Sequence, residues 1–399
     1  MMLTESEALE HVLKRISPGP LSEVSLAAAL GRYVARDYLA AVPIPSFDNS
    51  MMDGYAVHAD ETQGQGTLNI AGEQPAGIDL GLKCERGQAI RIFTGAPMPA
   101  GADAVIMQED VDRVGDSILC REPVERGENI RRLGADLCVG QVMLRRGEKI
   151  SAGRIGLLAS QGQGSVSVHT APQVAVISTG DELIQPGCGP LHSGQIYNSN
   201  GVMLQALLFE LGIADTSTAH CPDTFADTVC ILRSLIEMND VIVLSGGVSV
   251  GDHDHIKPAL LELGIPPDLW RVKVKPGKPF LFAQTTRSSD GRPVSIFGLP
   301  GNPVSSFVTF QLFVRPALLK WMGAAETAPS RFSAKVSQTL SNDGNRPHFL
   351  RGVLRDGIFQ VAGLQQSHAL FNLSQANALL RLEEGQTVAA GEVVTVLWL

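Results

Sequence analysis

The segment Val241–Asp252 constrains the fold more than any other part of the chain. Four apolar residues, Val-Ile-Val-Leu, end abruptly at Ser245, which is followed by two glycines, Ser249 and an acidic cluster. A short apolar run bounded by glycines is typical of a buried strand that leads into a glycine-rich loop. In α/β proteins such loops present backbone N–H groups to an anion. The segment therefore predicts an α/β fold that handles a phosphorylated or otherwise anionic ligand.

Bulk composition limits the classes of function open to this chain. Its 399 residues suggest two to four domains, and its formal net charge is −9 without a long basic run. Because phosphate contacts need clustered Lys and Arg, this charge argues against nucleic-acid binding as the main function. No apolar run is long enough to span a bilayer, and residues 1–16 do not resemble a signal peptide. We therefore expect neither a nucleic-acid nor a membrane partner.

Cysteine usage indicates the compartment. The six cysteines are scattered along the chain without a C-x-x-C pair. This pattern argues against a zinc site and against a disulfide framework. It favours a reducing, cytoplasmic location.

Helical segments bracket the first part of the chain. Residues 4–16 begin with a capping box formed by Thr4 and Glu7 and have apolar residues along one face. Ser25–Leu30 is typical of a second short helix that stops at a glycine. Helical character returns at 150–162. These segments predict a discontinuous N-terminal helical domain.

A long β-rich stretch separates those helical segments. Short β-type runs alternate there with turns, at Gly54–Val57, Ala89–Phe93 and Ala104–Met107. We therefore predict an inserted β-rich domain, 42–140, within an N-terminal domain made of 1–41 and 141–172.

The rest of the chain predicts two further domains. In 173–322, apolar strands alternate with helical segments, which indicates a mostly parallel, doubly wound sheet with helices on both faces. Residues 323–399 return to short strands and turns and predict a small C-terminal β-barrel or sandwich. The strands expected in the α/β domain are Val174–Ile177, Val241–Leu244 and Val294–Phe297, and the helices are 200–211, 225–237, 258–263 and 304–313.

Three loops of the α/β domain follow predicted strands, at Ser178–Glu182, Ser245–Asp254 and Gly298–Pro303. Ligands of open α/β sheets bind at the carboxyl ends of the strands, so we expect these loops to converge on one site. Each loop taken singly could equally be a plain chain reversal.

Carboxylates gather in the same loops. Asp181, Glu182, Asp252 and Asp254 would lie beside a phosphate site, where Mg²⁺ typically bridges one or two carboxylates, waters and phosphate oxygens. Helix N-capping is the alternative role for Asp181 and Asp252. For His253 and His255 we favour structural or hydrogen-bonding roles over metal ligation.

Three more elements have candidate chemistry. Lys275-Pro-Gly-Lys278 forms a compact cationic turn that could neutralise an oxyanion, although an exposed turn is the alternative. The loops that contain Asp53 and Thr94 are rich in turn-forming residues, and each loop taken alone is only weak evidence for a functional site.

Together these segments resemble one family, the molybdopterin molybdenumtransferases of the MoeA type, which includes the E domain of gephyrin. The matching motifs occur in family order from about residue 4 to residue 395. They are Phe47-Asp-Asn-Ser-Met-Met-Asp-Gly-Tyr-Ala-Val57, Thr94-Gly-Ala-Pro, Asn129-Ile-Arg-Arg, Ser178-Thr-Gly-Asp-Glu-Leu183, Ser245-Gly-Gly-Val-Ser-Val-Gly-Asp252, Lys275-Pro-Gly-Lys-Pro-Phe280, Gly298-Leu-Pro-Gly-Asn-Pro-Val-Ser305 and Arg351-Gly.

The resemblance implies a function. Such enzymes convert adenylyl-molybdopterin and molybdate into molybdenum cofactor and AMP, and they require Mg²⁺. The resemblance also implies an elongated N-terminal domain and a homodimer, whose active cleft lies between the α/β domain of one subunit and the inserted domain of the other. Molybdopterin adenylyltransferase and downstream cofactor-maturation proteins are the implied partners.

The resemblance further assigns roles by position. Asp53 and Thr94 should face the cleft from the inserted domain. Glu182, Asp223 and Asp254 should serve nucleotide–pterin binding and catalysis, with Glu182, Asp252 and Asp254 as the Mg²⁺ ligands. The remaining assignments are Ser245, Gly246, Gly247 and Ser249 for phosphate, Lys275, Lys278, Arg351 and Ser367 for molybdate or developing charge, and Pro300 and Pro303 for shaping the nearby loop.

Some positions depart from the family pattern, namely Met51, His253, His255 and Gly134-Ala-Asp136. No Ser/His/Asp or Cys/His arrangement is apparent, so we expect an electrostatic site with water as the nucleophile. Two alternatives stay open. A related adenylyltransferase would lack the large N-terminal region and the C-terminal domain, and a gephyrin-like scaffold would not need the acidic and lysine positions.

Overall fold

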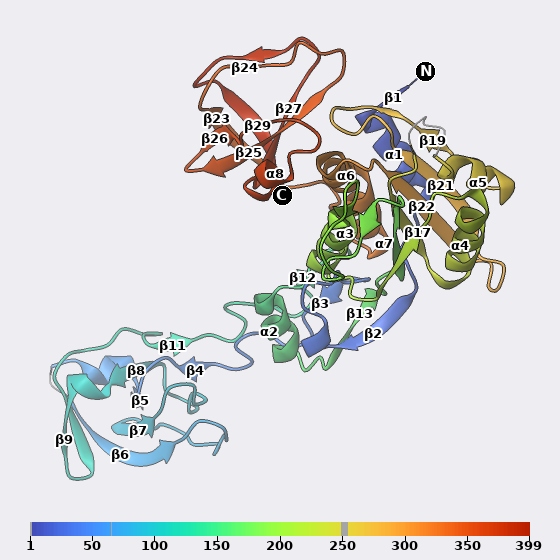
Figure 1. Ribbon diagram of the computed structural model, residues 1–399. Helices are drawn as coiled ribbons and strands as arrows, with labels where there is room; N and C mark the ends of the chain where they lie inside the picture. Colours follow the sequence, from blue (N-terminus) through green and yellow to red (C-terminus); the bar gives the residue numbers. More distant parts are fainter. Residues whose placement is uncertain (1, 65, 249–253) are drawn as a thin grey trace. The chain divides into compact units, whose positions relative to one another are not determined.

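The computed structural model describes residues 2–64, 66–248 and 254–399 of the chain (Figure 1). By its internal contacts the chain forms two compact units. The first unit comprises Met1–Arg36, Arg146–Ile155 and Gly164–Leu399, and the second comprises Asp37–Arg145 and Gly156–Gln163.

The first unit is built on a six-stranded sheet (Figure 1). Its order is β17 (Thr216–Cys221), β14 (Val174–Thr179), β18 (Val241–Ser245), β22 (Pro293–Leu299), β21 (Leu281–Thr286) and β19 (Leu269–Trp270). The first four strands are parallel, and β21 pairs antiparallel with β22 and β19. The prediction of a mostly parallel sheet is therefore confirmed, with an antiparallel edge.

Helices cover both faces of this sheet because successive strand residues point to opposite sides. On β14, Val174 and Val176 belong to one apolar core, whereas Ala175 and Ile177 belong to another. The first core is completed by α1 (Glu5–Arg15), α3 (Ser199–Glu210), α6 (Pro303–Thr309) and α7 (Arg315–Trp321), and the second by α4 (Phe225–Met238) and α5 (Ile256–Glu262).

The expected helices form close to their predicted positions, except for those predicted at 304–313 and at Ser25–Leu30. The capping box of Thr4 and Glu7 is present at the start of α1. The predicted helix 304–313 is α6 followed by a π-helical turn, η4 (Phe310–Val314). In the described part of the chain, no helix is long and apolar enough to cross a membrane.

The expected helix at Ser25–Leu30 is wrong. Leu21–Ser25 forms strand β2, which pairs antiparallel with β13 (Ser165–His169), and only Leu26–Ala28 forms a single 3₁₀ turn. The strand forms because 165–169 supplies a hydrogen-bonding partner that a local pattern does not reveal. Ser25 then caps the short turn, since its hydroxyl accepts from the Ala28 N–H.

The C-terminal part of the first unit is a closed barrel, so the barrel is the correct one of the two predicted β architectures. Its core includes Phe359, Leu380 and Val396, all almost completely buried. The strand order round the barrel is β23 (Arg331–Val336), β26 (Ile358–Val361), β25 (His348–Arg355), β27 (Ala378–Leu382) and β29 (Val393–Trp398), and Figure 1 labels these strands.

The second unit is β-rich, as predicted. It contains a six-stranded sheet in the order β8 (Ala104–Met107), β5 (Gly54–Val57), β7 (Gln88–Ile92), β6 (Thr67–Gln74), β10 (Ser117–Cys120) and β9 (Val111–Val114). Strand β5 pairs antiparallel with both β7 and β8. This register fixes where the loops at the ends of these strands emerge.

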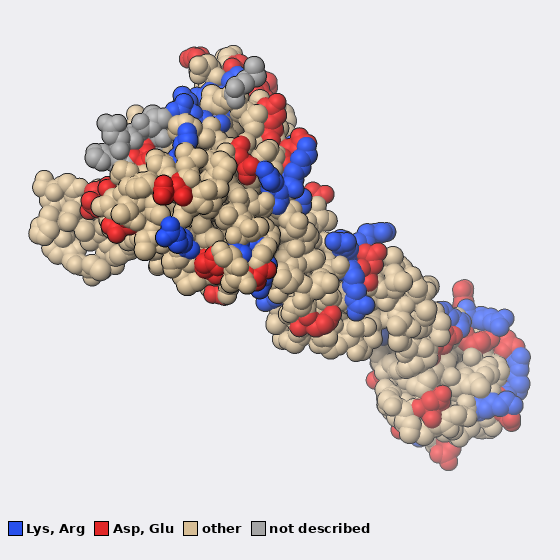
Figure 2. Space-filling view, turned by 90° about the vertical axis from the view of Figure 1, so that its right-hand side faces the viewer, with Lys and Arg blue, Asp and Glu red and all other residues tan. Residues whose placement is uncertain are grey.

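Charged side chains of both signs are interspersed on the face shown in Figure 2. Exposed side chains also form local ion pairs, such as Arg86 with Asp60 at 2.6 Å and Lys14 with Glu10 at 2.7 Å. Exposed pairs of this kind contribute little to stability because water screens them.

Candidate active site

A cavity of about 340 Å³ lies at the carboxyl ends of the four parallel strands. All three loops expected to converge contribute to it, and the loop after β17 joins them. Its lining consists of Thr179, Gly180, Glu182, Asp223, Gly246, Gly247, Val248, Asp254, Pro279, Pro300, Gly301 and Asn302.

Three predicted carboxylates line this cavity, namely Glu182, Asp223 and Asp254. The loops after β14 and β17 are tied together by reciprocal hydrogen bonds. The Asp181 N–H donates to the Asp223 carboxylate at 3.3 Å, and the Asp223 N–H donates to the Asp181 carboxylate at 3.2 Å. Asp181 therefore positions Asp223 and does not cap a helix.

The two glycines after β18 permit a close approach of neighbouring loops. Both have a positive φ, +96° for Gly246 and +67° for Gly247. A Cβ on Gly246 would lie 2.5 Å from the Thr179 hydroxyl oxygen, and one on Gly247 would lie 2.8 Å from Ile256 Cγ1. Only glycine fits both positions. The Gly246 N–H donates to the Leu299 carbonyl at 3.0 Å, so this donor is used within the protein.

Ser245 lies beneath the cavity and is buried. Its hydroxyl accepts a hydrogen bond from the Asn200 amide at 2.8 Å, and the same amide donates to the Gly301 carbonyl at 2.7 Å. Asn200 thus links the start of α3 to the loops after β18 and β22. Sequence reasoning missed Asn200, although an Asn-Ser-Asn run at a helix start is a signal for capping.

Trp270 holds the chain on both sides of residues 249–253. Its indole N–H donates to the Val248 carbonyl at 3.2 Å, and the Lys257 ammonium of α5 lies 3.4 Å from the ring centroid. The Arg271 guanidinium lies 4.5 Å from the same centroid. Ser249, Asp252 and His253, which were predicted from sequence, lie outside the described residues. His255 takes the N-cap position of α5 without a side-chain capping bond.

The oxygen donors of the cavity fit Mg²⁺ as it binds in phosphate sites. Among residues 2–64, 66–248 and 254–399, no three or more His, Cys, Asp and Glu side chains form a ready-made metal cluster. Mg²⁺ usually takes one or two carboxylates and completes its shell with waters and substrate phosphates. Glu182 and Asp254 line the same cavity and supply carboxylates of the kind that this mode uses.

The lysine turn lies next to the cavity, because Pro279, which follows Lys278 in the sequence, lines the cavity. Both Lys275 and Lys278 are exposed. The Val272 N–H closes the turn on the Lys278 carbonyl at 3.0 Å, and the Phe349 N–H of the barrel donates to the Lys275 carbonyl at 2.8 Å. The backbone therefore anchors the turn to the barrel and leaves both ammonium groups in solvent.

His348 and Arg351 of β25 lie at this junction. His348 is buried, and burial, with Lys275, Arg351 and Arg346 adding positive charge, lowers the pKa of its imidazole to about 4. Arg351 is 1 % exposed, and burial lowers the pKa of its guanidinium. Sequence reasoning missed His348 because the motif on its strand, Arg351-Gly, does not include it.

Arg351 holds the loop that contains Ser367. Its guanidinium donates to the Leu364 carbonyl at 2.8 Å and to the Gln366 carbonyl at 3.2 Å. The Ser367 carbonyl in turn accepts from the Val304 N–H, in the first turn of α6. Pro303 begins that helix, where its missing N–H has no partner to lose.

Asp53 and Thr94 lie together in the second unit. Gly54 pairs with Ile92, so the residue before β5 and the loop after β7 are neighbours. One carboxylate oxygen of Asp53 accepts from both the Thr94 N–H and the Thr94 hydroxyl, each at 2.8 Å. These bonds, the backbone one first, lower the pKa of Asp53.

Fold and site together define a multidomain α/β protein with an acid-lined cavity at its strand ends and a cationic turn beside it. Three family models match the chain: the MoeA N-terminal region (domain I and II) over residues 3–162, a Probable molybdopterin binding domain over 175–320, and the MoeA C-terminal region (domain IV) over 333–399.

Full-length relatives agree with these matches. The molybdopterin molybdenumtransferase of Haemophilus influenzae is 36% identical over 404 residues, which cover 99% of this chain and 98% of that protein. Molybdopterin molybdenumtransferase 2 of Mycobacterium tuberculosis is 36% identical and covers 94% of each chain. The crystal structure of the molybdopterin biosynthesis moeA protein from Pyrococcus horikoshii OT3 aligns over the whole of both chains, with 29% identity and a TM-score of 0.84. The chain belongs to the MoeA family of molybdopterin molybdenumtransferases.

Proposed function

We propose that this protein inserts molybdenum during molybdenum cofactor biosynthesis, converting adenylyl-molybdopterin and molybdate into molybdenum cofactor and AMP. The observation that carries the proposal is the convergence of Glu182, Asp223 and Asp254 with the Gly246-Gly247 loop in one cavity. Its chemistry suits the phosphate link of a nucleotide, and the full-length relatives named above give the reaction class.

Glu182 and Asp254 would hold Mg²⁺, with Asp252 as a third proposed ligand. Bound there, Mg²⁺ supplies positive charge to the phosphate oxygens. Asp223, fixed by its hydrogen bonds with Asp181, would orient the nucleotide–pterin. Gly247 and Ser249 would line the phosphate path with Gly246 and Ser245 supporting the loop, and Pro300 and Pro303 would shape the adjoining loop. Water would be the nucleophile at the adenylyl–phosphate link.

Molybdate is a tetrahedral dianion and would be held by the lysine turn. The exposed ammonium groups of Lys275 and Lys278 suit such an anion, and Ser367 would add a hydroxyl donor. Arg351 would act chiefly by holding the 364–367 loop, because its guanidinium donates to two carbonyls there. Fixed donors of this kind stabilise developing negative charge without reorganising during the reaction.

The proposed enzyme is a cytoplasmic homodimer with a composite active site. Asp53 and Thr94 of one copy would complete the cavity of the other. The family resemblance and the preformed Asp53–Thr94 pair support this arrangement. All six cysteines are free, which supports a reducing compartment. Molybdopterin adenylyltransferase would supply the substrate, and cofactor-maturation proteins would take the product.

One assay tests the function against its alternatives. Purified protein is mixed with adenylyl-molybdopterin, Mg²⁺ and molybdate, and AMP release and molybdenum incorporation are followed. We expect AMP release that depends on molybdate. Consumption of ATP with free molybdopterin would instead show an adenylyltransferase. Absence of both activities would indicate a non-catalytic scaffold.

The composite site has its own test. Variants Asp53→Ala and Glu182→Gln should each be inactive alone. If the two are mixed and exchange subunits, a mixed dimer contains one intact site, so activity should return to about a quarter of wild type when subunits pair at random. Absence of any recovery in dimers shown to have mixed would contradict the composite site.

A further inference from the structure

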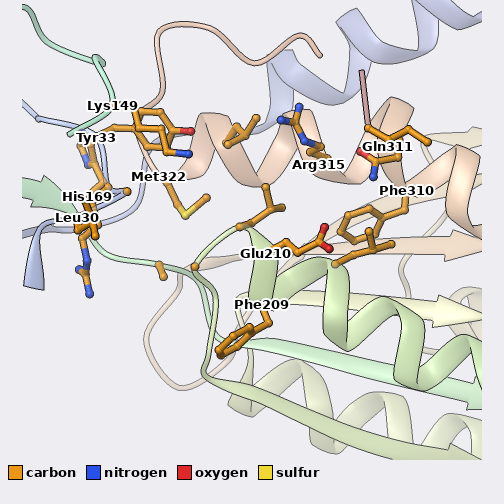
Figure 3. A pocket seen from close by; sticks show the side chains of 18 of the residues that line it. Leu30, Tyr33, Lys149, His169, Phe209, Glu210, Phe310, Gln311, Arg315 and Met322 are labelled. Carbon is orange, nitrogen blue, oxygen red and sulfur yellow. The ribbon is translucent and has the colours of Figure 1, made fainter. Parts of the chain in front are cut away.

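A second cavity, of about 570 Å³, lies in the first unit (Figure 3). It shares no lining residue with the cavity at the strand ends. The C-terminal end of α3 and the helical segment Phe310–Met322 form much of its wall, and Tyr33 and Lys149 face it from the N-terminal part of the unit. Its volume lies within the range of small-molecule sites, which is roughly 300–1,000 Å³.

The shape of this wall follows from Pro316. Proline has no N–H to donate to the carbonyl four residues earlier, so a regular α-helix is interrupted there. The chain forms the π-helical turn η4 instead, in which the Arg315 N–H bonds to the Phe310 carbonyl, five residues back. Gln311 and Arg315 both line the cavity as a result. Single π-helical turns are frequent at functional sites.

The guanidinium of Arg315 has an unused donor. Its Nη1 atom is buried and has no hydrogen-bond partner within the described residues. Burial lowers the pKa of Arg315 and raises that of Tyr33, which faces the same cavity. The Arg315 side chain lines the cavity, and a guanidinium stays charged at neutral pH, so an anion bound in the cavity would offset this poorly solvated charge.

The other lining groups add charge and apolar surface. Among the lining side chains, Arg32, Lys149 and Arg315 are positively charged and Glu210 is negatively charged, so the positive side chains are in excess. The apolar lining includes Leu30, Phe209, Phe310 and Met322, of which Phe209 is 72 % exposed. Figure 3 shows Arg315 and Gln311 on one side of the cavity and Phe209 on another.

We propose that this cavity binds a small organic anion, a carboxylate or phosphate ester with an apolar or aromatic body, whose anionic group pairs with Arg315. The apolar body would pack against Phe209, Phe310 and Met322. The site is separate from the proposed molybdenum insertion and does not depend on it.

Binding of two model ligands to the full-length chain tests the proposal. Isothermal titration with 1-naphthyl phosphate and with 2-naphthoate should give one site per chain for at least one probe, and their relative affinities distinguish phosphate from carboxylate. Arg315→Met should weaken binding at least roughly ten-fold, in line with loss of a charge-assisted hydrogen bond. Arg233→Met, at an exposed arginine of α4 that lines neither cavity, is the matched control and should bind as wild type does.

Thermal unfolding supplies an independent readout. Without a probe, Arg315→Met should melt at or above the wild-type temperature, because the substitution removes an unpartnered buried donor. The bound probe should raise the midpoint of wild type but not of the variant. Failure of both probes to bind wild type, equal binding by Arg315→Met, or a lowered midpoint of that variant would each overturn the proposal.

Discussion

One carboxylate oxygen of Asp53 accepts two hydrogen bonds from Thr94, from its backbone N–H and from its hydroxyl, each at 2.8 Å. The pairing of Gly54 with Ile92 brings these residues together, although 40 residues separate them in the sequence. The two bonds favour the ionised carboxylate and lower its pKa. The oxygen that a ligand would meet is therefore held in one orientation.

We expect Asp53→Ala to fold normally and to lose molybdate-dependent AMP release. Thr94→Val keeps the backbone bond but loses the hydroxyl donor, so the rate should fall about ten-fold, as for loss of one hydrogen bond to a charged group. Thr94→Ser should restore most of the rate, and Asp60→Ala, at an exposed ion pair of the same unit, should have little effect. Full activity of Asp53→Ala would remove this residue from the site.

The contribution of Asp53 to the stability of the fold should depend on pH in one direction. Because the folded-state pKa is lowered, the hydrogen bonds stabilise the fold above the ordinary Asp value of about 3.9 and lose that effect as pH falls through the lowered pKa. An NMR titration of the Asp53 carboxyl should show a pKa closer to the ordinary value in Thr94→Val.

Asn200 should couple two loops of the cavity. Asn200→Leu removes the bonds to Ser245 and Gly301, and the buried Ser245 hydroxyl that loses its donor should cost about 1–3 kcal/mol of unfolding free energy. Ser245→Ala removes one of these bonds and should cost less. Denaturant unfolding of both variants and of the double variant measures the coupling. Strictly additive effects would show that the two side chains do not act together.

The lysine turn requires glycine at position 277. Its φ is +117°, and a Cβ there would lie 2.5 Å from Thr309 Cγ2. Gly277→Ala should therefore lower the unfolding free energy by about 1–3 kcal/mol, through strain and overpacking. Gly291→Ala, with φ +71° and open space around it, controls for strain alone. Thr309→Ser removes the methyl group and should restore part of the loss in the Gly277→Ala background.

His348 should make the first unit sensitive to mild acid. Its folded-state pKa is about 4 against an ordinary 6.5, so the unfolded chain binds the proton more readily between these values. Unfolding free energy should fall by on the order of 3 kcal/mol as pH drops from 6.5 to 4. Denaturant titrations across this range should show a shallower slope in His348→Gln. The same slope in both proteins would assign the sensitivity to other groups.

Trp270 should position the loop after β18. Trp270→Phe keeps the ring under Lys257 but loses the hydrogen bond to Val248. We expect KM for adenylyl-molybdopterin to rise roughly three- to ten-fold, as for a hydrogen bond of about 1 kcal/mol, with kcat nearly unchanged. Trp270→Leu should have a larger effect because the cation–π contacts are also lost. Trp398→Phe, on the barrel, is the matched control.

Sequence patterns determined the elements and the edge of the sheet that carries the cavity. The apolar runs at Val174–Ile177 and Val241–Leu244 each had to be buried strands, and glycines after them marked the loops. The capping box at Thr4 is equally local. Such signals succeed because propensity, capping and hydrophobic period act within a few residues.

Tertiary structure decided which residues meet. Ser25 ends a strand because 165–169 pairs with it, and the Ser245 hydroxyl has a donor because packing of α3 on the sheet brings Asn200 to it. The Asp53–Thr94 pair depends on strand register, and the cavity at Arg315 depends on burial by segments far apart in the chain. Hydrogen-bond partners and burial are set by the packing of distant segments, and a local pattern contains neither.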